Sequence, residues 1–149
     1  MTVTTPQQTL TDSPMTNLAL AEELAAKLVR FLETNEPPKG LFTEDLFLDF
    51  TMPLWRMQGN GRAESVALRR NGHPAGGRVP RSRLDVTGTG FLLEVEEEWD
   101  DQGQQWYCRE LMRCDVTDGQ VSAISVYCTG DWDEATVARH RDSVELIRP

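Results

Sequence analysis

The sequence lacks the features of several large classes of protein. No apolar run approaches the roughly 20 residues that a membrane span requires, and no basic start with an apolar core indicates a secretory signal. The three cysteines show neither CxxC nor Cys/His spacing, so they predict reduced thiols in a cytoplasmic protein and no zinc site. The two histidines, His73 and His140, are isolated, so we expect no metal.

Basic residues are also scarce. The 15 lysines and arginines face 24 aspartates and glutamates, and the net charge is −9. Nucleic acids and anionic membranes bind to a clustered positive field, so neither is an expected partner. We interpret the one basic cluster as a solvated edge that offsets nearby acids; it contains Arg69, Arg70, Arg78, Arg81 and Arg83.

Sequence motifs for common cofactors are missing as well. There is no glycine loop that would cradle phosphate, no nucleophilic serine or cysteine motif, and no dinucleotide fingerprint. The sequence therefore predicts chemistry without a cofactor.

What remains is the composition of an ordinary globular domain. The chain has 149 residues, of which 39% are hydrophobic and 26% charged. Residues 1–12 are rich in Thr and Gln without an apolar period and predict a disordered tail. The length predicts one domain, over residues 13–149.

The N-terminal half predicts two helices and a short strand. Ser13 and Pro14 suit an N-cap and a first helical position, and the helix is expected to end at Thr34. Its apolar residues recur at helical spacing: Leu20, Leu24, Leu28, Phe31 and Leu32. We expect one helical turn over 41–45, a strand over 46–52 and a second helix over 61–71.

The C-terminal half predicts antiparallel strands. A strand over 78–87 contains Pro80, which favours an edge position. Three more strands and two tight turns fill residues 90–128, and Asp133 is expected to cap a last short helix that ends near Ser143. The order predicts an α+β fold in which helices cover one face of a curved sheet.

Two of these strands carry glutamates on their apolar faces. The strand period of two places on one face Phe91, Leu93, Val95, Glu97 and Trp99, and on the next strand Trp106, Cys108, Glu110, Met112, Cys114 and Val116. A short hairpin would bring Glu97 and Glu110 side by side. A carboxylate in such a place is either a functional group or a sign that the faces are assigned wrongly.

Glu110 is the strongest candidate for an acid–base residue. Burial disfavours the charged carboxylate and raises the pKa of the group, so the acid could act near neutral pH. The structural alternatives are a core glutamate paired with an arginine, or a β-bulge that turns the side chain outward.

The other candidates carry weaker signals. Glu97 could be a second acid or the partner that keeps Glu110 protonated. Asp49 could reach the same cavity from the first strand or cap a neighbouring helix. His73, in a loop rich in Gly and Pro, could act as a lid residue, but we interpret it as a solvated loop residue.

Three segments resemble a known superfamily. Residues 41–50 (LFTEDLFLDF), which follow the first helix, are similar to the opening strand of the SnoaL-like branch of the NTF2-like proteins. Residues 116–121 (VTDGQV) resemble the last strand turn of that branch, and residues 126–133 (VYCTGDWD) its C-terminal segment. The resemblance implies a cone-shaped, strongly curved, mostly antiparallel sheet wrapped on the long N-terminal helix around an apolar pocket.

The same resemblance implies several possible activities, because this fold hosts polyketide cyclases, steroid isomerases, limonene-type epoxide hydrolases, ether-forming cyclases and binding domains. Enzymes of the superfamily often place an acid or base on the strand that here holds Glu110. The Asp-Pro pair of the steroid isomerases would fall near Phe50 and Thr51, and neither is a base. The Arg-x-Asp element of the epoxide hydrolases corresponds to residues 113–115, on the polar face.

We therefore expect a cofactor-free cyclase or isomerase that closes or rearranges a ring in a hydrophobic, polyketide-type intermediate. Its catalytic candidates are Glu110, Glu97 and Asp49. The residues expected to bind the substrate are Trp55, Met57, Leu93, Val95, Trp106, Cys108, Met112, Tyr127 and Trp132.

Two alternatives stay open. One is an epoxide hydrolase or epoxide-opening cyclase of the same fold, and the other is a non-catalytic module for ligand binding or dimerisation. Carboxylates that face a pocket favour an enzyme, since a carrier gains nothing from desolvating them. Leu92, Tyr107 and Leu111 on the outer sheet face also predict a homodimer.

Overall fold

The computed structural model describes residues 14–149, so the predicted tail and the predicted cap Ser13 lie outside the described residues. The elements are, in order, α1 (Pro14–Thr34), β1 (Phe42–Met52), β2 (Trp55–Asn60), α2 (Arg62–Gly72), β3 (Gly77–Val86), β4 (Gly90–Asp101), β5 (Gln104–Thr117), β6 (Gln120–Cys128) and α3 (Glu134–Ser143). No helix within residues 14–149 combines the length and apolar character needed to cross a membrane.

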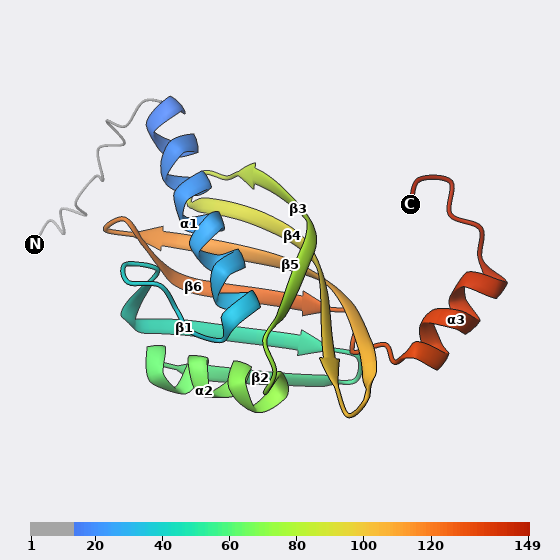
Figure 1. The fold of residues 1–149 in the computed structure, drawn as a ribbon. Helices are drawn as coiled ribbons and strands as arrows, with labels where there is room; N and C mark the ends of the chain where they lie inside the picture. The colour runs from blue at the N-terminus through green and yellow to red at the C-terminus, as the bar shows by residue number, and fades with distance from the viewer. Residues whose placement is uncertain (1–13) are drawn as a thin grey trace, which may run out of the picture.

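The six strands form one open, curved sheet in the order β2-β1-β6-β5-β4-β3 (Figure 1). All neighbours are antiparallel except β1 and β6, which are parallel. The strand with Pro80 is an edge strand, as predicted, and its register shifts between Arg78 and Arg81. The α+β fold and the mostly antiparallel, curved sheet are confirmed.

Two tight turns fix the register of the central strands. Gln102 and Gly103 have φ values of 53° and 75°, and Asp118 and Gly119 have 51° and 78°. Positive φ at both central residues is typical of the hairpin turn whose twist matches that of the flanking strands. Each turn is therefore two residues long and leaves little freedom for the register of β4, β5 and β6.

The predicted alternation of β4 and β5 is confirmed. Every odd residue of β4 from Phe91 to Trp99 is buried, and so are Cys108 and Glu110 of β5. Glu97 pairs with Cys108, and Val95 pairs with Glu110. The two glutamates therefore lie diagonally on the same inner face rather than directly opposite each other.

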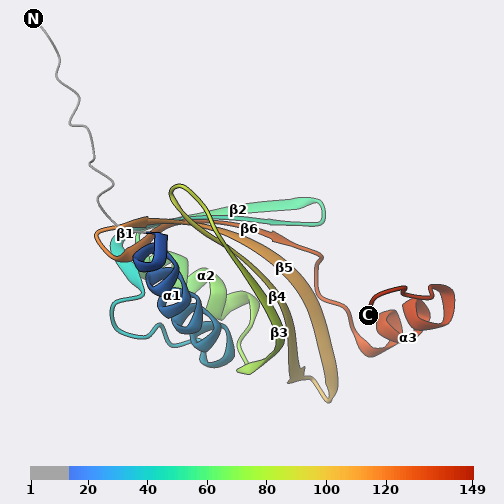
Figure 2. The ribbon, with the colours of Figure 1, turned by 90° about the horizontal axis from the view of Figure 1, so that it is seen from above.

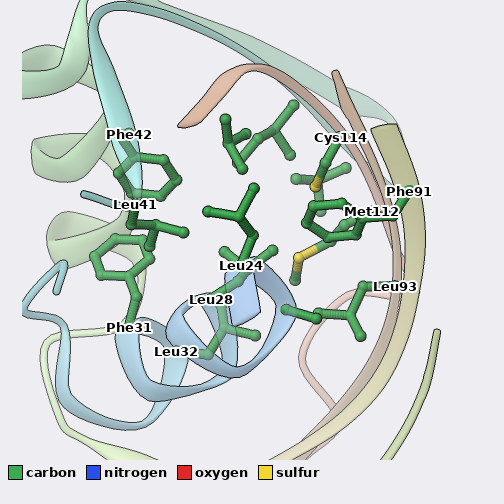
Figure 3. Packing of buried hydrophobic residues seen from close by; sticks show 14 of the residues in the cluster. Leu24, Leu28, Phe31, Leu32, Leu41, Phe42, Phe91, Leu93, Met112 and Cys114 are labelled. Atoms are coloured by element: carbon green, nitrogen blue, oxygen red, sulfur yellow. The ribbon is translucent and has the colours of Figure 1, made fainter. Parts of the chain in front are cut away.

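Helices α1 and α2 cover the concave face of the sheet, while α3 lies beyond its far end (Figure 2). In the core, Leu24 and Leu28 of α1 point toward the side chains of Phe91 and Leu93 on β4 (Figure 3). All four are at most 2% exposed. Burial of such side chains contributes about 1.5–3 kcal/mol each, so this layer holds the long helix on the sheet.

One prediction about the N-terminal half is wrong, and one strand was missed. Residues 41–45 are not a helical turn, because β1 already begins at Phe42. A register shift between Phe42 and Phe47 interrupts the alternation that would have revealed the strand. Strand β2 was not predicted, and its burial explains why: among its residues only Gly59 is buried, so the sequence carries no apolar alternation there.

The outer face of the sheet carries apolar side chains among charges, and Leu111 of β5 lies directly opposite Tyr127 of β6. Leu111 is 41% exposed, Tyr127 60% and Phe47 41%. Tyr107, by contrast, donates a hydrogen bond from its hydroxyl to Glu96 at 2.7 Å. A homodimer through this face stays a prediction.

Candidate functional site

A cavity of about 120 Å³ lies between helices α1 and α2 and the sheet. Its walls are mainly apolar, with Phe31, Leu48, Met57, Met112 and Val126 among the lining residues. Five polar side chains also line it: Ser65, Arg69, His73, Glu110 and Asp131. Apolar walls with a few convergent polar groups are typical of small-molecule sites, but a volume of about 120 Å³ is below the roughly 300–1,000 Å³ of sites for drug-sized ligands, so the cavity holds a small ligand or part of a larger one.

Glu110 is the buried acid of this cavity. It is 3% exposed, and its Oε1 has no hydrogen-bond partner in the structure. Burial, and then the negative charge of Glu97, raise the pKa of Glu110 well above its usual range, while Arg69 opposes the shift. The carboxyl group therefore favours its protonated form and has a free oxygen from which to act.

This pKa shift predicts a pH-dependent stability. A carboxyl whose pKa is higher in the folded than in the unfolded chain stabilises the fold fully below the unfolded value of 4.5, and this contribution is lost as the pH rises through the folded value. The free energy of unfolding of the Glu110→Gln variant, compared with that of the wild type, should therefore rise by about 1.4 kcal/mol per pH unit between the unfolded and the folded pKa of Glu110. Urea unfolding of both proteins across this pH range measures it, and a constant difference would contradict it.

Glu97 is paired rather than free. Its two oxygens accept hydrogen bonds from Arg69 Nη2 at 2.6 Å and Nη1 at 3.1 Å. The side chain of Glu97 is 4% exposed and that of Arg69 is 12% exposed. Glu97 does not line the cavity. The position of Glu97 therefore does not support its predicted role as a second acid in the cavity. The alternative prediction was that Glu97 keeps Glu110 protonated, and its charge does raise the pKa of Glu110.

Arg69 is not part of a solvated edge, which corrects the interpretation of the basic cluster. Besides Glu97, its guanidinium donates to the backbone oxygen of Leu32 at 2.9 Å and to Asn35 Oδ1 at 3.2 Å. These bonds tie α2 to β4 and to the end of α1. The charge of Glu97 keeps the pKa of Arg69 raised although burial acts against it.

The close approach of α2 to the sheet depends on Gly59. A Cβ there would lie 2.7 Å from Ser65 Oγ and 3.0 Å from Ser65 Cα. Because real Cβ atoms do not approach backbone atoms so closely, any side chain at Gly59 would push α2 away. Gly59 thus helps to set the positions of Arg69 and His73.

His73 is a buried cavity residue, so its interpretation as a solvated loop residue is wrong. It is 7% exposed, and its ring packs on Trp99 with centroids 4.4 Å apart. Its backbone N–H donates to Arg69 O at 2.8 Å, and its carbonyl accepts from the side-chain amide of Asn35. Burial and the charge of Arg69 lower the pKa of His73 to about 4, so the ring is neutral at pH 7.

Asp131 follows β6 and lies at the more open part of the cavity. Its side chain is 32% exposed, and Oδ1 lies 3.6 Å from Nε2 of His73. This separation is longer than a hydrogen bond. Burial, and then the charge of Glu97, raise the pKa of Asp131, while Arg69 opposes the shift.

Cys108, Glu110 and Cys128 form the one grouping among residues 14–149 with ligand atoms close enough to surround a metal ion, all within 4.8 Å of one another. A metal would require the deprotonated forms of these groups. Hydrogen bonding with Cys128 and burial raise the pKa of Cys108, and the pKa of Glu110 is raised too. Hydrogen bonding with Cys108 lowers the pKa of Cys128, however, so two of the three groups favour their protonated forms.

Four predicted site residues neither line the cavity nor face inward from β4 and β5. Asp49 faces the outer side, where its carboxylate accepts hydrogen bonds from Arg56 at 2.6 and 2.8 Å, and it neither reaches the cavity nor caps a helix. Tyr127 lies on the same outer face, 60% exposed, and Trp55, 65% exposed, lies at the tip of the β1–β2 hairpin. Trp132 packs its ring on Tyr107, with centroids 5.6 Å apart.

The remaining predicted substrate-binding residues divide into two groups. Met57 and Met112 line the cavity. The others face inward from β4 and β5 but do not line it: Leu93, Val95, Trp106 and Cys108. Leu93 and Val95 belong to the core, and Trp106 donates its indole N–H to the backbone oxygen of Asp101 at 3.1 Å.

Arg69 could have been found from the sequence. It follows the buried Ser65 and Val66 by four and three residues, so it shares their face of α2. For His73 the only signal is its place directly after that helix. Its burial depends on Asn35 and Trp99, which are distant in the chain.

The fold has known structural counterparts. An NTF2-like protein from Anabaena variabilis is 20% identical and superimposes with a TM-score of 0.65, over 83% of this chain and 96% of that one. A protein from Xanthomonas campestris with the provisional name polyketide cyclase is 17% identical, with a TM-score of 0.59 over 74% and 91% of the two chains.

A third counterpart is the epoxide hydrolase/cyclase-like enzyme SalBIII of pyran ring formation in the polyether salinomycin. It is 15% identical, with a TM-score of 0.62 over 78% of this chain and 98% of that one. No family model matches the chain, and no curated protein matches its sequence. The chain thus has the NTF2-like fold that its sequence resemblance implies.

Proposed function

We propose that this protein is a cofactor-free cyclase or isomerase that closes or rearranges a ring in a small hydrophobic intermediate of the polyketide type. The observation that carries the proposal is Glu110, a buried acid with an unpartnered oxygen in an otherwise apolar cavity. A buried carboxyl oxygen without a hydrogen bond costs free energy in such a place, so its presence there indicates use. The names of the similar proteins from Xanthomonas campestris and salinomycin biosynthesis support the same class.

In the proposed reaction, the apolar walls hold the substrate in a conformation close to that of the transition state. Glu110, in its protonated form, donates a hydrogen bond or its proton to the substrate oxygen on which negative charge develops. Arg69 does not act on the substrate in this mechanism. Its charge is neutralised by Glu97, and the pair fixes the wall of the cavity beside Glu110.

Epoxide opening is the second candidate, because SalBIII carries the same fold and an epoxide hydrolase/cyclase-like name. A protonated Glu110 could equally donate to the oxygen of an epoxide ring. Opening of the epoxide by water adds one water to the substrate, whereas opening by a hydroxyl of the substrate itself conserves the mass, as a ring closure on a ketone does. The two ring closures therefore differ in the substrate that is converted, a ketone or a hydroxy-epoxide.

The proposal is tested by incubating the purified protein with linear polyketide-type ketones and with hydroxy-epoxides of comparable size. Mass spectrometry of the products is the measurement. A cyclic product of unchanged mass from a ketone supports the proposal. A cyclic ether of unchanged mass from a hydroxy-epoxide supports epoxide-opening cyclisation, and a product heavier by one water supports epoxide hydrolysis. Tight binding of these compounds without turnover would point to a ligand-binding module.

A further inference from the structure

His73 and Asp131 are polar cavity residues that the proposed role of Glu110 does not use. Both line the same cavity as Glu110, but they come from other elements, the end of α2 and the segment after β6. A site that moves a proton from one atom to another needs an acceptor as well as a donor. Glu110, held in its protonated form, supplies only the donor.

We propose that Asp131 is the general base of this cavity and that His73 is the residue that positions it. The inference rests on the proposed function, because it assigns the second proton-transfer group of the same site. Asp131 would take a proton from the substrate, and the electron pair left behind would form the new bond. The oxygen that receives the displaced electrons would accept a hydrogen bond or a proton from Glu110.

The environment of His73 suits a positioning role. Its ring is held on Trp99, and its backbone is tied on both sides, to Arg69 and to Asn35. The ring is neutral, so it does not neutralise Asp131 in an ion pair at pH 7. The 3.6 Å between Nε2 and Oδ1 can shorten to a hydrogen bond when a ligand fills the cavity, as catalytic contacts commonly do.

The position of Asp131 suits a base. It is partly exposed at the cavity, so its proton can return to solvent after each turnover. Burial, Glu97 of β4 and Arg69 of α2 act on its pKa. The other titratable groups around it are His73, directly after α2, Glu110 of β5, which lines the same cavity, and Cys128 of β6. Buried Glu110 is held protonated and suits the role of acid, whereas the partly solvated carboxylate of Asp131 suits the role of base.

The base is tested with a probe that does not require the natural substrate. Nitrobenzisoxazole is small and apolar, and a carboxylate converts it by taking its C–H proton. The C–H electron pair then forms a nitrile, the N–O bond breaks, and a coloured phenolate leaves. Absorbance of the phenolate, followed across the pH range, gives both the rate and the pKa of the base.

We expect Asp131→Asn to lower this rate by about 100-fold. The matched control is Asp49→Asn, because Asp49 is an aspartate paired with Arg56 on the outer face, and its loss should leave the rate unchanged. His73→Gln, which keeps an N–H donor, should retain most of the rate. His73→Leu should lower the rate and move the midpoint of the pH profile upward, which a purely structural role would not do.

Two results would overturn the inference. A wild-type rate no faster than that of Asp131→Asn would show that Asp131 is not a working base. Loss of the pH-dependent rate in Glu110→Gln but not in Asp131→Asn would assign the base to Glu110 and would also contradict its role as the acid. If Asp131→Asn alone removes the pH-dependent rate, the inference holds even where no cyclase substrate is found.

Discussion

Replacement of Glu110 by Gln is expected to lower the rate of the proposed ring closure by about 100- to 10,000-fold, the range typical of a lost acid–base group. Glutamine has nearly the same shape and can still donate a hydrogen bond, but it has no proton to transfer. Because the variant removes a buried carboxyl group of which one oxygen has no hydrogen-bond partner, it should fold at least as stably as the wild type. Steady-state kinetics with the substrate identified by product analysis measures the effect.

The control for this experiment is Asp49→Asn, which removes a predicted catalytic carboxylate that the structure places on the outer face. It should leave kcat and KM unchanged. A Glu110→Gln variant that keeps full activity would rule out Glu110 as the acid. The shape of the cavity alone would then have to account for the reaction.

Replacement of Arg69 by Met is expected to destabilise the fold by about 3–5 kcal/mol, because it leaves the carboxylate of Glu97 buried without a partner. This is a large part of the roughly 5–15 kcal/mol that stabilises a typical domain. The variant also removes the bonds from α2 to Leu32 and Asn35. Urea unfolding followed by circular dichroism measures the change.

The neighbouring Arg70 provides a matched control. Its ion pair with Glu36 is exposed, with side chains 45% and 76% accessible, and its Nε donates to the backbone oxygen of Asn35 at 3.0 Å. Arg70→Met leaves no charge buried, so it should cost no more than about 2 kcal/mol. The double variant Arg69→Met with Glu97→Gln should recover part of the stability, since no charge is then left unpaired. Equal losses in Arg69→Met and Arg70→Met would contradict the account of the buried pair.

The sequence predicts the inner face of the sheet well because the pleat of a strand is a local property. The alternation from Phe91 to Trp99 and the two-residue turns determine which side chains of β4 and β5 face inward. The same local argument placed Glu97 and Glu110 among apolar residues. It could not tell which of them lines the cavity, because that depends on where α2 docks.

The rest of the candidate site depends on contacts between distant segments. Arg69 reaches Glu97 across 28 positions and Asn35 across 34, and no local pattern specifies these partners. His73 is buried because Asn35 holds its carbonyl and Trp99 supports its ring. Asp49 was misplaced for a simpler reason: the faces of β1 were both largely apolar in sequence, so the pleat did not indicate which side faced inward.

The central claim is that Glu110 is a protonated acid at neutral pH, and infrared titration of its carboxyl group tests this most directly. The difference spectrum between the wild type and Glu110→Gln isolates the C=O band of this one group. We predict that the band of the protonated acid persists at pH 7, because burial and the charge of Glu97 raise the pKa of Glu110. A band that disappears with a pKa near the ordinary value of 4.5 would contradict the claim and leave Glu110 without its proposed role.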